Sequence, residues 1–414
     1  MDRIRINFLF LNVGHFYDHL FVLIFATMAA TVLTGDWNLS YAQLIPYATP
    51  GFIAFGVGAI PAGWLADRWS RENMMTVFFI GIGASSALAS FADTPLQLSF
   101  GLLAIGAFAS IYHPVALAMV VQGRNRTGIA LAINGVFGNF GIASAALLTG
   151  LIIDLAGWRM AFVVPGCLSV ATGIGYAYFV RSKHGLYPTL PESQTRRPAP
   201  GGAEAAGLRN QVIRIFSVIF ITTAIGGLIF QSAGFSMPKI IDERMADFAN
   251  SATLIGWYAF IIFAVASVGQ LIIGYLIDRH SVRNVFMLVA AGQVILLALM
   301  RDIDGVAAFL VSIGFMLMIF GQLPINDVLV GRIARPEWRS RIYAARYLVS
   351  FLVAATAIPF IAWMHANWGF GNLFMLLSAA AGVILICVFA LPASGALIRI
   401  SAPSAVKPYE YPLN

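Results

Sequence analysis

Long apolar stretches separated by short polar interruptions follow one another along almost the whole chain. A hydrocarbon core of about 30 Å is crossed by about 20 residues of α-helix, and each stretch is long enough to do so. Backbone groups in lipid must form hydrogen bonds within their own segment, so these stretches must be helices. We predict twelve transmembrane helices, over 7–33, 41–66, 73–92, 95–121, 127–154, 158–180, 211–238, 251–277, 284–301, 305–332, 341–364 and 369–393.

One segment in the middle of the chain breaks this pattern. Residues 181–210 are rich in proline and glycine and carry Arg196 and Arg197, a composition typical of a flexible linker. Six predicted helices lie on each side. We therefore expect an N-terminal six-helix bundle at 1–180, a linker at 181–210, and a C-terminal six-helix bundle with a short tail at 211–414.

The composition agrees with a membrane protein. Hydrophobic residues make up 59% of the chain and charged residues 10%, against roughly a quarter charged in soluble proteins. The net charge of +7 does not indicate nucleic-acid binding, because the basic residues are spread between the apolar stretches. Cys167 and Cys387 are too few for a disulfide framework or zinc cluster and are expected to be buried. We expect a monomer in the lipid bilayer with a small-molecule substrate, no nucleic acid and no cofactor.

The basic residues also predict the orientation. Only Arg159, Lys239, Arg244 and Arg301 fall on one membrane face. Cytoplasmic loops are enriched in lysine and arginine, so the richer face, with both termini and the linker, is expected in the cytoplasm of a bacterium, the chain being a multi-pass inner-membrane protein. The basic residues of that face include Arg3, Arg5, Arg68, Arg71, Arg124, Arg126, Arg279, Arg283, Arg332, Arg335, Arg339 and Arg341.

An internal repeat relates the two halves, with its markers about 210 positions apart. Duplicated six-helix halves around a site at the membrane midplane are typical of transporters that work by alternating access. Pro114 and Pro324 are expected to break or kink their helices, either to free carbonyls near a cavity or for packing alone. The matching pairs are Gly63–Arg68 with Gly274–Arg279, Arg71 with Arg283, Pro114 with Pro324, and Trp158 with Trp368.

The repeated loop is a candidate conformational latch. A carboxylate at a helix end can pair with arginines and with a neighbouring helix end, and so favour one conformer. The candidates are Asp67, Arg68 and Arg71 in the first copy. Gly63 would permit close helix approach. The alternative to a latch is that the charged residues of this loop only set the orientation of the chain in the membrane. The second copy supplies Gly274, Asp278, Arg279 and Arg283.

The sequence Gly-x-x-x-Asp-Arg-x-x-Arg at 63–71 resembles the signature loop of the major facilitator superfamily, and the resemblance extends over essentially the whole chain. It implies an all-α membrane protein with twelve transmembrane helices in two pseudo-symmetric six-helix bundles. It also implies secondary active transport of a small solute.

A finer resemblance involves two short motifs. The stretch 106–114 and the stretch 138–141, with His15 and Asp18, are similar to the fosmidomycin-resistance-like branch of bacterial drug exporters. This resemblance implies proton-coupled efflux of a small organic molecule or drug by an antiporter. Residues 143–145 read Ala-Ser-Ala where other drug exporters have a Gly-Pro signature, which leaves the direction of transport open.

Polar residues inside the predicted helices are the candidate site. A charged group at the bilayer centre costs about 2.5–3.5 kcal/mol on insertion scales, so such residues usually line a cavity. Asp18 and His113 should lie about 16 Å and about 12 Å from the cytoplasmic ends of their oppositely directed helices, and so at similar depth. The candidates of the first half are Asn12, His15, Asp18, His19, Tyr112, His113 and Asn139.

We predict that Asp18 with His15 or His113 forms a proton-sensitive site, because an imidazole titrates near neutral pH. The alternative is that these groups only fix helix packing. In the second half the candidates are Gln231, Gln322, Asn326, Asp327 and Arg346. Asp327 suits an inner-gate salt bridge or substrate contact, and Arg346 either attracts an anionic substrate or extends to the interface.

Other functions remain open at this point. Proton-coupled uptake of a nutrient or metal ion is one alternative. Copper transport favours soft ligands at helical spacing, and Met-x-x-x-Met and His-x-x-x-Met are absent. His15 with His19 is the one pair that favours a metal, and we predict no metal site. A non-transporting receptor or scaffold is a further alternative. No His-Glu-x-x-His, Gly-x-Ser-x-Gly or Walker-type motif is present, so we do not expect an enzyme.

Overall fold

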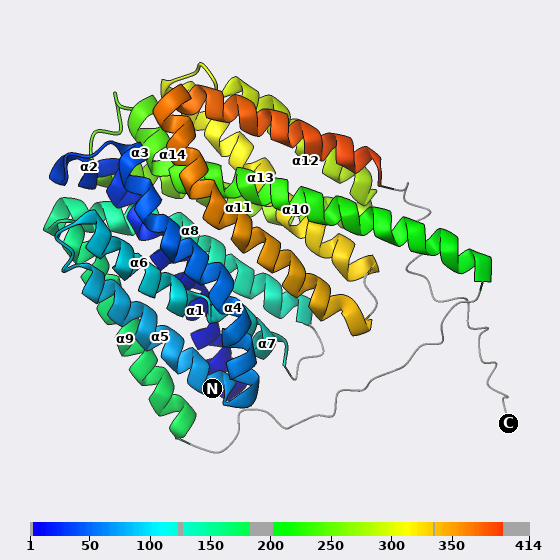
Figure 1. Cartoon of the computed structure of the whole chain (residues 1–414), viewed down its shortest axis with the longest axis horizontal. Coiled ribbons are helices and arrows are strands. Elements are labelled where there is room, and N and C mark those ends of the chain that lie inside the picture. The colour runs from blue at the N-terminus through cyan, green and yellow to red at the C-terminus, as the bar shows by residue number, and fades with distance from the viewer. Residues whose placement is uncertain (1–2, 123–126, 183–201, 334–335, 392–414) are drawn as a thin grey trace.

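The structure, a computed structural model, describes residues 3–122, 127–182, 202–333 and 336–391, and they form an elongated all-helical bundle (Figure 1). The first half comprises α1 (Arg3–Thr31), α2 (Leu33–Asp36), α3 (Tyr41–Leu44), η1 (Ile45–Ala48), α4 (Thr49–Arg68), α5 (Arg71–Ala89), α6 (Pro95–Ala109), α7 (Tyr112–Val121), α8 (Thr127–Ala156) and α9 (Trp158–Arg181). The second half comprises α10 (Gly202–Arg244), α11 (Ala252–Arg279), α12 (Val282–Leu299), α13 (Gly305–Ile333) and α14 (Pro336–Phe389).

Eleven stretches of the described residues are long and apolar enough to cross a membrane. The last, Leu348–Phe389, is 42 residues long, about twice what one crossing needs. Gly369 interrupts it with a positive φ of 70°, a conformation that glycine adopts at little cost. The stretch therefore consists of two membrane helices joined at a sharp turn, and the twelve predicted helices are accounted for.

The expected linker is shorter than predicted. Arg181 still belongs to α9, and α10 begins at Gly202, so residues 202–210 are helical. The last proline of the segment is Pro200, and Ala203-Glu204-Ala205-Ala206 are strong helix formers, which explains the early start. Residues 183–201 lie outside the described part of the chain.

The two matched prolines behave differently. The fourth membrane helix is divided into α6 and α7 just before Pro114, whose ring excludes the normal hydrogen bond to the preceding turn. The interruption at residues 110–111, one turn before Pro114, is in keeping with the break expected there. In the second half, α13 runs through Pro324 without interruption.

The two matched tryptophans are not structurally equivalent. Gly157 and Gly369 both have positive φ, at 84° and 70°, and each forms the turn before a helix. The residues that follow them are Trp158 and Phe370, with exposed fractions of 6% and 2%. Trp368 precedes its turn and is 56% exposed. The structural repeat therefore pairs Trp158 with Phe370, and the predicted match to Trp368 is wrong.

The halves touch most closely through α8 and α11. We call the end of the bundle with Arg3, Arg181 and Gly202 the linker side, and the opposite end the distal side. In Figure 1 the linker-side ends of α9 and α10 point away from each other. Contacts between the halves extend from the middle to the distal side. They include Asp154 Oδ2 with Thr253 N at 2.8 Å, Asn139 Nδ2 with Gln270 Oε1 at 2.9 Å, and the rings of Phe55 and Phe351 with centroids 4.6 Å apart.

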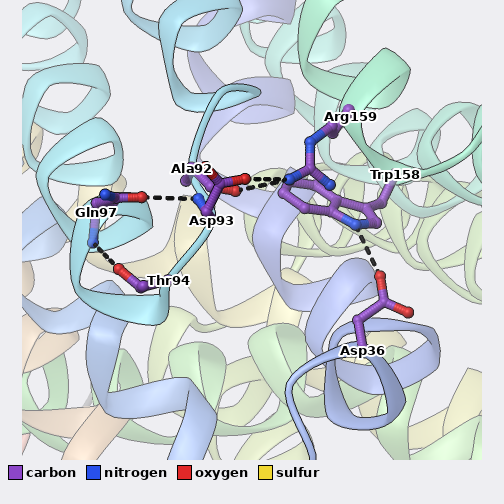
Figure 2. Close-up of polar contacts among 7 residues, drawn as sticks. All are labelled: Asp36, Ala92, Asp93, Thr94, Gln97, Trp158 and Arg159. Carbon is purple, nitrogen blue, oxygen red and sulfur yellow. Dashed lines mark hydrogen bonds and ion pairs between the residues drawn. The ribbon is translucent and has the colours of Figure 1, made fainter.

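Polar contacts tie the distal loops of the first half together, as Figure 2 shows. Trp158 Nε1 donates to Asp36 Oδ2 at 2.9 Å, which joins the start of α9 to α2. Arg159 donates to Asp93 Oδ1 at 2.9 Å and to the carbonyl oxygen of Ala92 at 3.1 Å. These contacts fix the loop between α5 and α6 against α9.

Large apolar side chains are exposed on the outside of the bundle, including Phe91, Leu155 and Ile386. Such a surface suits lipid and not water. Cys167 lies on it and is exposed, whereas Cys387 is half-buried. The expectation that both cysteines are buried is therefore wrong, because an apolar run of a membrane helix has a face turned to lipid as well as a face turned inward.

Candidate functional site

The first half brings Asp18 and His113 together. Asp18 Oδ2 in α1 lies 3.2 Å from His113 Nε2 in α7, and the Asp18 side chain is fully buried. This contact confirms the similar depth expected of the two residues. Asp18 Oδ1 is also buried and has no hydrogen-bond partner among the described residues. A buried carboxylate with an unpartnered oxygen is costly unless a cation or proton compensates it.

Three histidines form a compact cluster beside this pair. The ring of His15 lies 5.0 Å from that of His19 and 5.4 Å from that of His113, and the rings of His19 and His113 are 5.7 Å apart. His15 and His19 are four residues apart on α1 and therefore project from the same face. The cluster brings together three of the predicted candidates, His15, His19 and His113.

Asn134 organises the polar core around the cluster. Its carbonyl oxygen lies 2.8 Å from His15 Nδ1, and its side-chain amide donates to Asn12 Oδ1 at 3.0 Å and to Tyr112 Oη at 2.9 Å. Tyr112 in turn donates to the carbonyl oxygen of Leu11 at 2.8 Å. The sequence analysis did not select Asn134. Its signal was an amide in the apolar run of the fifth membrane helix, five residues before the predicted Asn139.

The interface between the halves passes close to the cluster. His113 contacts the rings of Phe55 in α4 and Phe351 in α14, with centroid distances of 6.0 Å and 5.7 Å. Asn139, which was predicted for the cavity, donates instead across the interface to Gln270 in α11. The histidine cluster therefore lies just inside the first half, against the surface where the halves meet.

The second half contributes an ion pair between Asp327 in α13 and Arg346 in α14. The side chain of Arg346 is 10% exposed and that of Asp327 is 48% exposed. The guanidinium of Arg346 is therefore largely buried in this pair. Phe351, five residues further along α14, touches His113, so the ion pair lies about 7–8 Å along that helix from the contact with the first half.

Two of the remaining polar candidates of the second half, Gln322 and Asn326, form hydrogen bonds that hold helices together. Gln322 donates to the carbonyl oxygen of Thr222 at 3.0 Å and accepts from Gln293 at 2.9 Å. Thr222 Oγ1 lies 3.4 Å from Asn326 Oδ1. These bonds join α10, α12 and α13. Gln231 in α10 is buried, and its Nε2 has no hydrogen-bond partner among the described residues.

The predicted latch residues of each copy contact neighbours in the same half of the protein. Arg71 pairs with Asp67 at 2.9 Å, and Arg68 stacks on the ring of Trp64. A Cβ on Gly63 would lie 3.3 Å from Pro114 Cβ, in keeping with the close approach expected there. In the second copy Asp278 is exposed, and Gly274 faces open space. Arg279 stacks on Tyr275, and Arg283 lies over the ring of Phe389 at 5.9 Å.

Comparison with known proteins agrees with this architecture. The sequence profile of the Major Facilitator Superfamily matches residues 11–246 and 219–408. The chain belongs to the Major Facilitator Superfamily. The twelve helices form the two pseudo-symmetric bundles of that superfamily.

Among curated superfamily members, a gallate transporter of Pseudomonas putida is 25% identical over 301 residues. That match covers 63% of each chain, so somewhat less than two thirds of the relative's length is spanned. A cis,cis-muconate transport protein of Acinetobacter baylyi is 22% identical over 367 residues, covering 84% of each chain. A 4-hydroxybenzoate transporter of Pseudomonas putida is 28% identical over 144 residues, covering 34% of this chain and 32% of the relative.

Solved superfamily structures share the fold. A bacterial homologue of the human lysosomal transporter Spinster, in an inward-facing and unoccupied conformation, has a TM-score of 0.70 at 14% identity and covers 96% of both chains. A D-xylose–proton symporter has a TM-score of 0.68 at 15% identity, covering 92% of this chain and 96% of the other. The resemblance to the fosmidomycin-resistance-like branch stays a prediction, because these relatives do not include that branch.

Proposed function

We propose that this transporter carries a small organic acid into the cell together with protons. The observation that carries the proposal is the inward-held guanidinium of Arg346, paired with a carboxylate that is half exposed. A guanidinium binds carboxylates through two parallel hydrogen bonds. Gallate, cis,cis-muconate and 4-hydroxybenzoate, named for three relatives, are all carboxylic acids, which supports the same substrate class here.

In this proposal the substrate carboxylate and Asp327 compete for Arg346. When Asp327 takes up a proton it no longer holds the guanidinium, and an incoming carboxylate replaces it. When the substrate leaves, Asp327 loses its proton and pairs with Arg346 again. One proton thus accompanies each carboxylate, and the substrate anion and the proton move in the same direction.

The contacts between the halves support opening towards the linker side. The bundles at 1–180 and 211–414 would rock about the interface of α8 and α11, with the linker between them. The arginine-rich loops favour a cytoplasmic linker side, so the conformation is inward-facing, with both termini in the cytoplasm of a bacterium. A monomer suffices for this cycle, because one chain supplies both halves.

A second candidate is proton-driven efflux, which the motifs at 106–114 and 138–141 favour. The sequence-based hypothesis assigns the coupling proton to Asp18 with His15 or His113. Flux of Asp18→Asn against a pH gradient tests it, and coupled transport equal to that of the wild type would exclude that role.

The decisive experiment measures flux in proteoliposomes containing the purified protein. Radiolabelled 4-hydroxybenzoate, gallate and cis,cis-muconate are supplied outside, with an imposed inward proton gradient. We expect at least one labelled acid to accumulate inside the proteoliposomes. Unlabelled acid should compete with its uptake, whereas the methyl ester of the same acid should not. Expulsion of preloaded solute by the same gradient would instead establish antiport, and absence of flux for every acid would contradict the proposal.

Two variants test the ion pair. Arg346→Gln should abolish acid transport, whereas Asp327→Asn should bind the acid and lose the dependence of transport on the proton gradient. The double variant, which removes both charges, separates lost transport from misfolding, because no charge is left unpaired. Arg301→Gln, at an exposed arginine of the distal side, is the matched control and should transport normally.

A further inference from the structure

We propose that His15, His19 and His113 bind a divalent transition-metal ion such as Zn²⁺. The ligand nitrogens of the three side chains all lie within 4.8 Å of one another. They come from two helices, α1 and α7, whose positions are fixed by the polar core around Asn134. This site lies in the first half and is independent of the Arg346–Asp327 pair on which the proposed function rests.

The geometry needs only a small side-chain adjustment. Zinc–nitrogen bonds are about 2.0–2.1 Å long, so ligand nitrogens around one ion lie roughly 3–3.5 Å apart. His19 and His113 are only partly buried and can rotate to close the remaining distance. His15 cannot move as freely, because its ring stacks on Tyr112 with centroids 4.8 Å apart.

The hydrogen bond of His15 prepares it as a ligand. A carbonyl oxygen only accepts, so His15 Nδ1 carries the hydrogen that points to Asn134 O at 2.8 Å. In the neutral ring the lone pair is then on Nε2. Metal-binding histidines almost always have this arrangement, with the second nitrogen donating to a carbonyl or carboxylate.

Asp18 supplies the second, independent observation. Its carboxylate is fully buried beside the cluster, and Oδ1 has no hydrogen-bond partner among the described residues. Aromatic packing explains three adjacent rings, and the contact with His113 reaches only Oδ2, so Oδ1 of this buried carboxylate is left without a partner in the described part of the chain. A divalent cation held by neutral imidazoles would compensate it. Asp18 would serve as a fourth ligand or as the anion next to the bound ion.

The donor set defines the class of metal. Imidazole nitrogens with one carboxylate suit Zn²⁺, Ni²⁺, Co²⁺ and Cu²⁺. Mg²⁺ and Ca²⁺ prefer oxygen ligands throughout, and Cu⁺ prefers sulfur, which none of the four side chains offers. The sequence analysis found only His15 and His19 at helical spacing and predicted no metal site. The depth of His113 follows from a count of residues, but whether its face of α7 turns toward α1 depends on how the two helices pack.

The test is metal binding by the full chain, purified with an affinity tag that contains no histidines and stripped with a chelator. Titration calorimetry with Zn²⁺ should give one ion per chain, and Co²⁺ should give the visible absorption of a tetrahedral site. His15→Ala, His19→Ala and His113→Ala should each weaken Zn²⁺ binding at least tenfold. Asp18→Asn should weaken it as well.

His365→Ala and His280→Ala are the matched controls, because these histidines lie away from the cluster and are expected to leave Zn²⁺ binding unchanged. Should a cluster variant fold poorly, thermal unfolding provides a second test. Zn²⁺ should raise the melting temperature of the wild type and should not raise that of His19→Gln. Absence of stoichiometric binding, or equal weakening by the controls, would overturn the proposal. Either result leaves acid transport to be judged separately, because the binding assay contains no organic acid.

Discussion

Asp154 in α8 accepts a hydrogen bond from the backbone N–H of Thr253, in the first turn of α11, with 2.8 Å between Oδ2 and N. The two residues belong to different halves. The first turn of a helix has N–H groups without partners and a partial positive charge, both of which an aspartate satisfies. This contact therefore holds the distal ends of the halves together in the present conformation.

Replacing Asp154 by alanine should favour opening on the distal side. An acidic group near a helix N-terminus contributes about 0.3–1 kcal/mol, so the population with separated distal ends should rise about two- to fivefold. Spin labels at Ala156 and Asn250, in a chain with Cys167 and Cys387 replaced by serine, report the distance between the halves. Asp247→Ala, at another exposed acid of the distal side, should leave the distances unchanged. Identical distributions for both variants would refute the role of Asp154.

Replacing Gly138 by alanine should displace His15. A Cβ at this position would lie 2.6 Å from His15 Nε2, closer than side-chain atoms approach one another. Overpacking of this kind costs about 1–3 kcal/mol, so the melting temperature should fall. If the histidines bind Zn²⁺, its affinity should fall too, although no ligand is removed.

Gly135, three residues earlier on α8, is the control for this substitution. A Cβ there meets nothing within 4 Å, and alanine favours helix over glycine by about 1 kcal/mol. Gly135→Ala should therefore be neutral or stabilising in the same thermal unfolding measurement. Equal destabilisation by the two variants would mean that α8 tolerates no side chain on this face, and that the clash with His15 is not the cause.

Replacing Trp158 by phenylalanine should weaken the distal loops of the first half. The change keeps an aromatic ring in a buried position but removes the hydrogen bond to Asp36, at a cost of about 0.5–1.5 kcal/mol. Trp368→Phe, at the exposed tryptophan, should have almost no effect. Thermal unfolding followed by circular dichroism distinguishes the two. A larger effect at Trp368 would argue against the structural repeat that pairs Trp158 with Phe370.

The membrane helices could be predicted because each depends on its own sequence. Lipid requires every spanning segment to be apolar and helical, so the boundaries follow from local composition. The contact of Asp18 with His113 could be anticipated in the same way, since depth along a helix is a count of residues. The early start of α10 was missed because the proline-rich composition of the preceding segment was extended to Gly202–Asn210.

Contacts between helices could not be predicted in this way. Asn134, Gln293 and Phe351 acquire their partners only when helices far apart in the chain pack together. One sequence specifies which residues are polar, but not the rotation of each helix about its axis. For the same reason Asn139 was expected in the cavity, whereas it bonds across the interface of the halves.

The amide pair formed by Asn139 and Gln270 bridges α8 and α11 in the interior of the membrane. Both groups are neutral, so separating them exposes no bare charge to a medium of low dielectric constant, as the separation of two ions would. Each amide can turn to a water molecule in the opened space and return to its partner afterwards. A reversible swing of the halves therefore exposes no unpaired charge at this point of the interface.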